Sequence, residues 1–293
     1  MDHMESPVVV GVDGSHGSLQ AVDWAAAEAE RSGTPLRLVH ASLWEHYEGV
    51  RPSIGTDRPS QQVYAENLVA TAEQRVQRLT PGVKATTAVQ PDDPVTALLR
   101  EADEASLLVL GPRGHGPILS MLLGSVSLAL AGRAHCPVVV VRGEEPNRRG
   151  AFDRVVLGVG ATTGSTVAAR FALAQAGSRG SELLAVRAWR CPAHESMPYP
   201  LLGGEQERAY RQEADECVDR VLGVVRTDYP RVPLRRKVVQ GTAHQTLIEE
   251  SDGADLLVVG ARRRLGAAGL QLGRVNHAVL HHAACPVAVV PER

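Results

Sequence analysis

A glycine-rich segment in the first half of the chain has the composition of an anion-binding loop. It runs from Gly111 to Ser127, reads GPRGHGPILSMLLGSVS and follows the short apolar run LLVL. The glycines at 111, 114 and 124 allow backbone N–H groups to approach a ligand closely. A helix expected to begin near Ser125 adds unpaired N–H groups and a favourable dipole. From these residues alone, the segment is either a phosphate-binding loop or only a tight connection between a strand and a helix.

Three polar side chains can add to such a site. The hydroxyls of Ser125 and Ser127 can donate to phosphate oxygens or complete the shell of a Mg²⁺ ion. Asp13 follows the first apolar run of the chain, and an ionised carboxylate is suited to accept from a ribose hydroxyl or a base. The alternative for Asp13 is the N-cap of a helix expected over residues 15–33.

Other nucleotide motifs and catalytic sets do not match the sequence. Neither Lys84 nor Lys237 follows a glycine, which excludes the Walker A loop. The run GVGATTG at 158–164 resembles a dinucleotide fingerprint, but its last gap is one residue too long and the second strand of that half ends near Arg187 rather than an acid. No paired carboxylates, nucleophile elbow or Ser–His–Asp arrangement is recognisable. We therefore expect binding rather than turnover, and we assign no catalytic residue.

Composition and charge restrict the class of protein. A chain of 293 residues with 44% hydrophobic content is long enough for two domains. The net charge of −2 creates no field that would gather nucleic acid or an anionic membrane. The cysteines form no CxxC pair, the N-terminus does not resemble a signal peptide, and the uncharged stretch 114–132 is interrupted by glycine and serine. These features favour a cytoplasmic protein without a membrane span.

The chain contains an internal repeat. The run VVVGVDGSHGS at 8–18 returns as VVLGVGATTGS at 155–165, and AHCPVVVVR at 134–142 returns as AACPVAVVP at 283–291. We therefore expect two domains, at residues 1–143 and 153–293. The segment GEEPNRRGAF between them is rich in charged residues and turn formers and is interpreted as a linker.

Within each half, apolar runs of strand length alternate with segments of helical period, which is typical of an α/β fold. We expect two tandem Rossmann-like domains, each a five-stranded parallel sheet flanked by helices. Strands of the first half are expected at 7–12, 35–41, 83–89, 107–110 and 137–142. A helix over 61–79 is expected to bury a stripe made of Leu68, Ala72, Val76 and Leu79. Ligands of such sheets collect at the carboxyl ends of the strands, so the loops after strands one and four should meet in one crevice.

These motifs together resemble the universal stress protein family over nearly the whole chain. The pattern Gly111-x2-Gly114-x9-Gly124-Ser125 is similar to that of the family's nucleotide-binding members, as are the VVVGVDGS and HCPVVVV strands. The resemblance implies that the first domain binds ATP. The residues expected around the nucleotide, with Ser127 added from its hydroxyl chemistry, are Gly11, Asp13, Ala41, Leu110, Gly111, Gly114, Gly124, Ser125, Val126 and Ser127.

The resemblance further implies a stress or signalling regulator whose behaviour depends on nucleotide. The hydroxyls of Ser125 and Ser127 leave Mg²⁺ open as a further ligand, and the sequence does not identify the metal. Two alternatives remain. One is a slow ATP hydrolase or self-phosphorylating enzyme, and the other is a pure interaction module in which the nucleotide is structural. Family members pair through their last strand, so we also expect an intramolecular pseudo-dimer of the two domains, a homodimer and protein partners that the sequence does not identify.

The second half departs from the motif. Gly160 replaces Asp13, Arg263 replaces Gly114 and Arg274 replaces Ser125. Arginine adds bulk where backbone must touch phosphate, so we expect poor ATP binding there. The alternative is a different anion site formed by the arginines at 262, 263, 264 and 274. His281 and His282 are adjacent, so they cannot chelate one metal from a helix, and we expect them at the surface.

Overall fold

The computed structural model describes residues 6–42, 60–112, 123–161, 165–191, 200–262 and 272–292. The chain divides into two compact units, residues 1–142 (unit 1) and residues 143–293 (unit 2). Each described unit is an α/β fold with a parallel sheet, so the Rossmann-like fold expected from the sequence is confirmed. No helix within the described ranges combines the length and the apolar character needed to span a bilayer.

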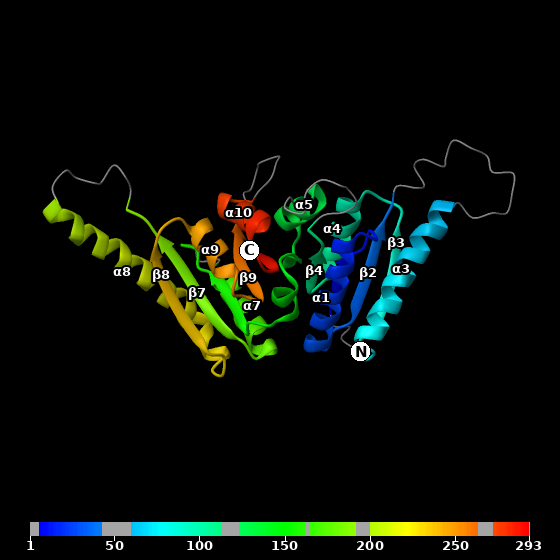
Figure 1. Ribbon diagram of the computed structural model, residues 1–293, viewed down its shortest axis with the longest axis horizontal. Helices are drawn as coiled ribbons and strands as arrows, with labels where there is room; N and C mark the ends of the chain where they lie inside the picture. Colours follow the sequence, from blue (N-terminus) through cyan, green and yellow to red (C-terminus); the bar gives the residue numbers. More distant parts are fainter. Residues whose placement is uncertain are drawn as a thin grey trace. The chain divides into compact units, whose positions relative to one another are not determined.

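The sheet of unit 1 is doubly wound (Figure 1). Its described strands are β1 (Val8–Gly11), β2 (Leu36–Ala41), β3 (Ala85–Gln90), β4 (Leu107–Leu110) and β5 (Val138–Val140). The strand order is β3-β2-β1-β4-β5, with every neighbour parallel. Val8 of β1 lies opposite Leu36 on one side and Leu107 on the other. The order of strands therefore reverses between β1 and β4, where ligands of doubly wound sheets bind.

Helices cover both faces of this sheet. The described helices of unit 1 are α1 (His16–Ser32), α3 (Ser60–Leu79), α4 (Pro94–Glu104) and α5 (Ser125–Arg133). α1 packs beside α3, and α4 packs beside α5. α1 ends at Gly33, whose φ of 69° is the left-handed conformation favoured by a C-terminal glycine. Because both faces are covered, strands such as β1 and β4 are almost wholly buried apolar runs.

The buried stripe of α3 differs from the predicted one. The buried positions are Ala65, Val69, Ala72 and Val76. Leu79 is 54% exposed, and the next buried position is Thr80, which is 4% exposed. The prediction was therefore wrong at Leu68, which is only half-buried, and at Leu79. The buried positions recur with a spacing of four, three and four residues, so the stripe meets Val69 and Thr80 instead.

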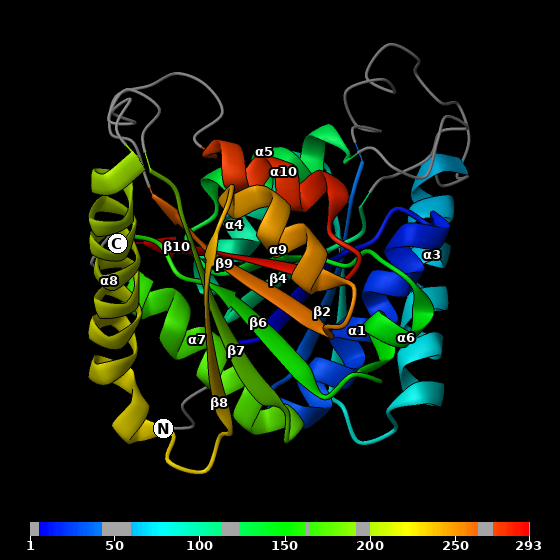
Figure 2. The same ribbon diagram turned by 60° about the vertical axis from the view of Figure 1, so that its left-hand side comes forward.

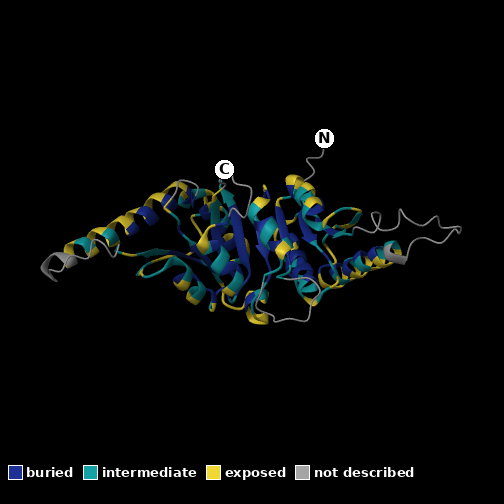
Figure 3. Ribbon diagram, turned by 90° about the horizontal axis from the view of Figure 1, so that it is seen from above, coloured by how far each residue is buried: buried dark blue, intermediate teal, exposed yellow. Residues whose placement is uncertain are grey.

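Unit 2 has the same topology (Figure 2). Its described strands are β6 (Arg154–Gly158), β7 (Glu182–Trp189), β8 (Leu234–Gln240), β9 (Leu256–Arg262) and β10 (Val287–Glu292). Their order is β10-β9-β6-β7-β8. The main described helices are α7 (Ser165–Arg179), α8 (Pro200–Val225), α9 (Ala243–Ser251) and α10 (Arg274–His282). α7 packs beside α8, and α9 packs beside α10. In both units, buried residues concentrate on the strands and the inner sides of the helices (Figure 3).

The segment interpreted as a linker forms part of unit 2. It contains the short helix α6 (Glu145–Arg149), and Asn147 on this helix is 3% exposed. The amide nitrogen Nδ2 of Asn147 lies 3.4, 3.1 and 2.9 Å from the carbonyl oxygens of Ser251, Asp252 and Ala254. A buried amide with carbonyl partners fixes the approach of the chain to the first strand of unit 2.

Candidate functional site

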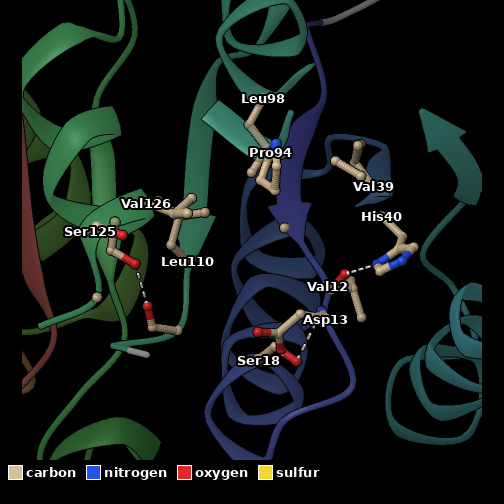
Figure 4. A pocket seen from close by; sticks show the side chains of 15 residues that line it. Val12, Asp13, Ser18, Val39, His40, Pro94, Leu98, Leu110, Ser125 and Val126 are labelled. Atoms are coloured by element: carbon tan, nitrogen blue, oxygen red, sulfur yellow. Dashed lines mark hydrogen bonds between the residues drawn. The ribbon is translucent and has the colours of Figure 1, made fainter. Parts of the chain in front are cut away.

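A cavity of about 350 Å³ opens at the carboxyl ends of β1, β2 and β4 in unit 1 (Figure 4). Of the residues predicted to surround a nucleotide, Gly114 lies outside the described part of the chain. The others all line this cavity: Gly11, Asp13, Ala41, Leu110, Gly111, Gly124, Ser125, Val126 and Ser127. The crevice expected between the loops after the first and fourth strands is therefore present.

Asp13 is held in place by a turn that leaves one carboxylate oxygen uncommitted. Oδ1 accepts from the backbone N–H of Ser15 at 2.9 Å and from the Ser15 hydroxyl at 2.6 Å. The N-cap of α1 is Ser15, whose hydroxyl accepts from the N–H of Ser18 at 3.2 Å. The N-cap alternative for Asp13 is therefore wrong, since it precedes the cap in an Asx-type turn. Oδ2 has no hydrogen-bond partner among the described residues, so Asp13 retains an acceptor at the cavity.

His40 joins the ends of two strands beside the cavity. Its ring nitrogen Nδ1 lies 2.7 Å from the carbonyl oxygen of Val12. A carbonyl oxygen can only accept, so Nδ1 carries the proton and donates. This bond fixes the segment after β1 to the end of β2, as Figure 4 shows. Leu98 and Pro94, from α4, add apolar surface to the same cavity.

The start of α5 supplies the anion-binding part of the cavity. α5 begins at Ser125, as expected, and its N-cap Gly124 has extended backbone angles and makes no side-chain capping bond. The N–H of Gly124 donates to the carbonyl oxygen of Pro112 at 2.7 Å. No side-chain cap therefore competes for the N–H groups of the first turn of α5, which lies at the rim of the cavity.

The two serines of this turn have different surroundings. The Ser127 hydroxyl donates to the carbonyl oxygen of Gly111 at 2.8 Å, and the residue is 6% exposed. Its hydrogen is therefore committed inside the loop. Ser125, by contrast, is exposed at the first helical position, where its hydroxyl can reach a ligand.

Gly111 also has a packing reason to be glycine. A Cβ atom at this position would lie 2.7 Å from the carbonyl carbon of Gly17 and 2.9 Å from the backbone nitrogen of Ser18. These are backbone atoms at the start of α1, which cannot move aside as a flexible side chain can. The loop after β4 therefore packs directly on α1, independently of any ligand.

Unit 2 has a smaller cleft of about 200 Å³ at the equivalent place. A guanidinium nitrogen of Arg187 donates to the carbonyl oxygen of Val159 at 3.0 Å, in the place of His40 and Val12. Gly160 lines this cleft where Asp13 lines the cavity of unit 1, so the acceptor carboxylate is missing. Arg187 is also bulkier than histidine, which reduces the space between the strand ends.

Glu292 places a carboxylate in the second cleft. Its side chain is 11% exposed, and it lines the cleft beside Gly260, the counterpart of Gly111. A Cβ atom on Gly260 would lie 2.6 Å from Oε1 of Glu292. A negative charge so close to this glycine disfavours a phosphate there. Sequence reasoning missed Glu292, and the only available signal was the difference between Glu292 and its counterpart Gly143 after the last strand.

No group of three or more His, Cys, Asp or Glu side chains able to hold a metal is found within the described ranges. The arginines at 263 and 264, expected as part of an alternative anion site, lie outside these ranges. Arg262 is described and lies 3.8 Å from the Glu292 carboxylate. Arg274 occupies the first position of α10.

The strand order and the crevice at the switch point define an α/β fold of the Rossmann-like class. The model of the universal stress protein family matches residues 4–142 and 151–291. The chain therefore belongs to the universal stress protein family, as the sequence motifs indicated.

A similar protein agrees with this assignment, and a solved structure supports the fold. A universal stress protein from Mycobacterium tuberculosis (strain ATCC 25618 / H37Rv) is 33% identical over 306 aligned residues, which cover 96% of each chain. The crystal structure of a universal stress protein from Archaeoglobus fulgidus has a TM-score of 0.66 at 16% identity and covers 99% of both chains, which supports the fold. A universal stress protein in complex with cAMP is 31% identical over 47% of this chain and 97% of its own, with a TM-score of 0.36. The cAMP is a ligand of that protein.

Proposed function

We propose that unit 1 binds ATP and that the chain acts as a nucleotide-dependent regulator in stress or signalling. The observation that carries the proposal is the joint placement of an uncommitted carboxylate oxygen on Asp13 and an uncapped helix N-terminus at Ser125 in one cavity. An acceptor for a sugar hydroxyl and a set of N–H donors for phosphates are the two polar requirements of a nucleotide. The cavity volume of about 350 Å³ lies within the usual range for small-molecule sites.

Each part of ATP has a matching part of the cavity. The apolar side chains of Val39, Leu98 and Pro94 suit the adenine ring. Oδ2 of Asp13 would accept from the ribose. The N–H groups at the start of α5 would donate to the phosphates, and the Ser125 hydroxyl would add one donor. A Mg²⁺ ion would be held mainly by phosphate oxygens and water, because Asp13 is the single carboxylate among the described lining residues.

The cavity supports binding better than hydrolysis or self-phosphorylation. Among the described lining residues, Asp13 and His40 are the titratable side chains, and both make hydrogen bonds that fix the local backbone. Incubation with γ-labelled ATP tests this point. We expect no labelled protein and no release of phosphate above the uncatalysed rate. Either product would favour the enzymatic alternative.

Thermal unfolding with and without ATP tests the proposed site. ATP at a hundred times its dissociation constant should stabilise the folded chain by about 2.7 kcal/mol. Asp13→Ala and Gly124→Arg should each abolish this shift, because they remove the acceptor and obstruct the helix N-terminus. The matched control is Gly273→Arg at the equivalent N-cap of unit 2, where an added Cβ meets no heavy atom within 4 Å. This variant should keep the full ATP response, and its loss would contradict the assignment to unit 1.

The pure interaction module makes a different prediction. If the nucleotide is only structural or absent, Gly124→Arg should leave partner binding in a cell extract unchanged. A regulator requires ATP to alter the set of co-purifying proteins, and Gly124→Arg to remove that difference.

Assembly and location remain proposals from the sequence. We propose a homodimer, an intramolecular pairing of the CPVVVVR and CPVAVVP strands and a cytoplasmic location. Analytical ultracentrifugation measures the first. Hydrogen exchange of the amides in β5 and β10 measures the second, since unprotected amides in either strand would refute the pairing. Cell fractionation measures the third.

A further inference from the structure

A second cavity in unit 2 is lined by several basic side chains. It has a volume of about 700 Å³ and is lined by the end of β7, by α9 where it begins together with the residues just before it, and by α10. Its basic side chains come from these three segments: Arg190, His244, Arg274, His277, His281 and His282. No aspartate or glutamate is found among the described residues that line it. His282 is exposed, as expected, and His281 is half-buried, and both line this open cavity.

The two arginines of this cavity lack the carboxylate partners that several other arginines of unit 2 have. Arg154 pairs with Glu182 at 2.7 Å, and Arg170 and Arg236 pair with Asp228 and Asp219. Within the described ranges, Arg190 and Arg274 make no ion pair with a carboxylate. Cations gathered in a cavity without acidic neighbours raise the local concentration of anions and bind them.

The equivalent positions of unit 1 have the opposite character. Asp92 and the N-cap Asp93 directly precede α4, and the Asp93 carboxylate accepts from the N–H of Thr96 at 2.9 Å. In unit 2, Gly241 and Thr242 stand at these positions, and α9 has no side-chain capping bond. The start of α9 is therefore not occupied by a carboxylate of the chain itself.

The same contrast is found on the last helix of each unit. Ser125 and Leu128 on α5 correspond to Arg274 and His277 on α10. The rings of His277 and His281 lie parallel at a centroid distance of 6.1 Å and line the cavity. Among the described residues, the basic side chains at these two positions are therefore found in unit 2 and not in unit 1.

We propose that this cavity binds a compact polyanion that carries adjoining phosphoryl groups. The cavity presents two permanent guanidinium charges and several imidazole donors. One carboxylate or one monovalent anion carries too little negative charge and too few acceptor atoms to satisfy all of them. Arginine also presents a planar fork of donors that matches phosphate oxygens. Inorganic polyphosphates and the triphosphate of a nucleotide share this chemistry.

Calorimetric titration with inorganic tripolyphosphate tests the proposal at 0.15 M salt, where weak surface attraction is screened. The titration uses Gly124→Arg, so that the helix N-terminus of unit 1 is obstructed. We expect one tripolyphosphate per chain. Adding Arg274→Ser and His277→Leu, the residues of unit 1, should weaken binding at least tenfold. Arg220→Ser, which removes an exposed charge from α8, should leave the affinity unchanged.

Three results would overturn the inference: no binding by Gly124→Arg at millimolar tripolyphosphate, equal affinity after the exchange at 274 and 277, or equal affinity for sulfate. Thermal unfolding shows whether the exchanged chain is folded. In the background with Gly124 intact, the same exchange should leave the ATP response of unit 1 unchanged, which separates this inference from the proposed function.

A titration of the same Gly124→Arg chain with ATP identifies the source of the phosphoryl groups. Binding to the cavity by ATP indicates a nucleotide triphosphate, and binding by tripolyphosphate alone indicates an inorganic ligand.

Discussion

Unit 1 and unit 2 fix the same two backbone carbonyl groups with different side chains. The carbonyl after the first strand of each unit accepts from an imidazole in unit 1 and from a guanidinium in unit 2. In unit 1, the carbonyl oxygen of Gly111, directly after β4, accepts from a hydroxyl. In unit 2, the carbonyl oxygen of its counterpart Gly260, in β9, accepts from a side-chain amide. The four donors are His40, Arg187, Ser127 and Asn276. The framework therefore requires a donor at these places but not a particular residue.

The residues that line the crevices of the two units differ in their charge and in the acceptors that they offer. Asp13 supplies an acceptor in unit 1, whereas Gly160 supplies none in unit 2. Ser125 at the start of α5 corresponds to Arg274 at the start of α10, and Glu292 brings a carboxylate beside Gly260. The comparison indicates that one fold has kept its internal bonds while the chemistry of its two crevices has diverged.

The largest effect is expected at a position where unit 2 has a buried carboxylate and unit 1 has a serine. Asp255 is 3% exposed and accepts from the N–H groups of Phe152 and Arg154 at 2.9 and 3.0 Å. Asp255→Ala should destabilise unit 2 by about 3 kcal/mol, because two hydrogen bonds to a charged group are lost. Ser106→Ala at the exposed counterpart should cost under about 1 kcal/mol. Hydrogen exchange resolved by unit measures both, and equal costs would contradict the comparison.

A smaller effect is expected for the two glycines behind the crevices. Gly111→Ala should destabilise unit 1 by about 2 kcal/mol, since its Cβ would press on the backbone of α1. Gly260→Ala should cost less, because its Cβ meets the end of the Glu292 side chain, which can rotate away. Urea unfolding of both variants gives the difference. A larger cost at Gly260 would show that Glu292 is rigidly held.

The alkaline stability of unit 1 provides a third comparison. Burial raises the pKa of the Cys136 thiol from 9.0 to about 11. Between these values the unfolded chain has lost the proton that the folded chain keeps, so stability falls as pH rises. At pH 10 the loss should be about 1.4 kcal/mol, and Cys136→Ala should remove this slope. A slope that persists in the variant would assign the titration to another group.

The smallest effect is expected from rebuilding the second crevice. A chain with Gly160→Asp, Arg263→Gly, Arg274→Ser and Glu292→Gly has the acceptor restored and the obstructing groups removed. We expect a weak second ATP site, which adds about 0.4 kcal/mol of stability at an ATP concentration equal to its dissociation constant. Omitting Glu292→Gly from the set is the control. Equal binding with Glu292 retained would show that its carboxylate does not exclude phosphate.

The sequence predicted the fold better than the details of the crevices. The strand at 107–110 agrees with β4, and the other expected strands of unit 1 shift by no more than two residues at either end. Continuous apolar runs and repeated motifs are local signals, so they can be recognised without coordinates. The stripe on α3 was misplaced because the burial of Leu79 or Thr80 depends on how the helix meets the sheet.

The parts of the sites that were missed depend on contacts distant in sequence. Glu292 reaches Gly260 only because β10 lies beside β9. The cationic cavity combines Arg190, His244 and His277, which come from three separate segments. Neither arrangement has a spacing that marks it in the sequence, whereas the glycine spacing of unit 1 does.

Isothermal titration calorimetry of the whole chain with ATP tests the central claim of asymmetry most directly. The titration uses the chain with Arg274→Ser and His277→Leu, so that the cationic cavity does not take up ATP. We expect one ATP per chain, retained when Gly273→Arg is added and lost when Asp13→Ala is added. Two equivalent ATP sites, or one site that survives Asp13→Ala, would contradict it.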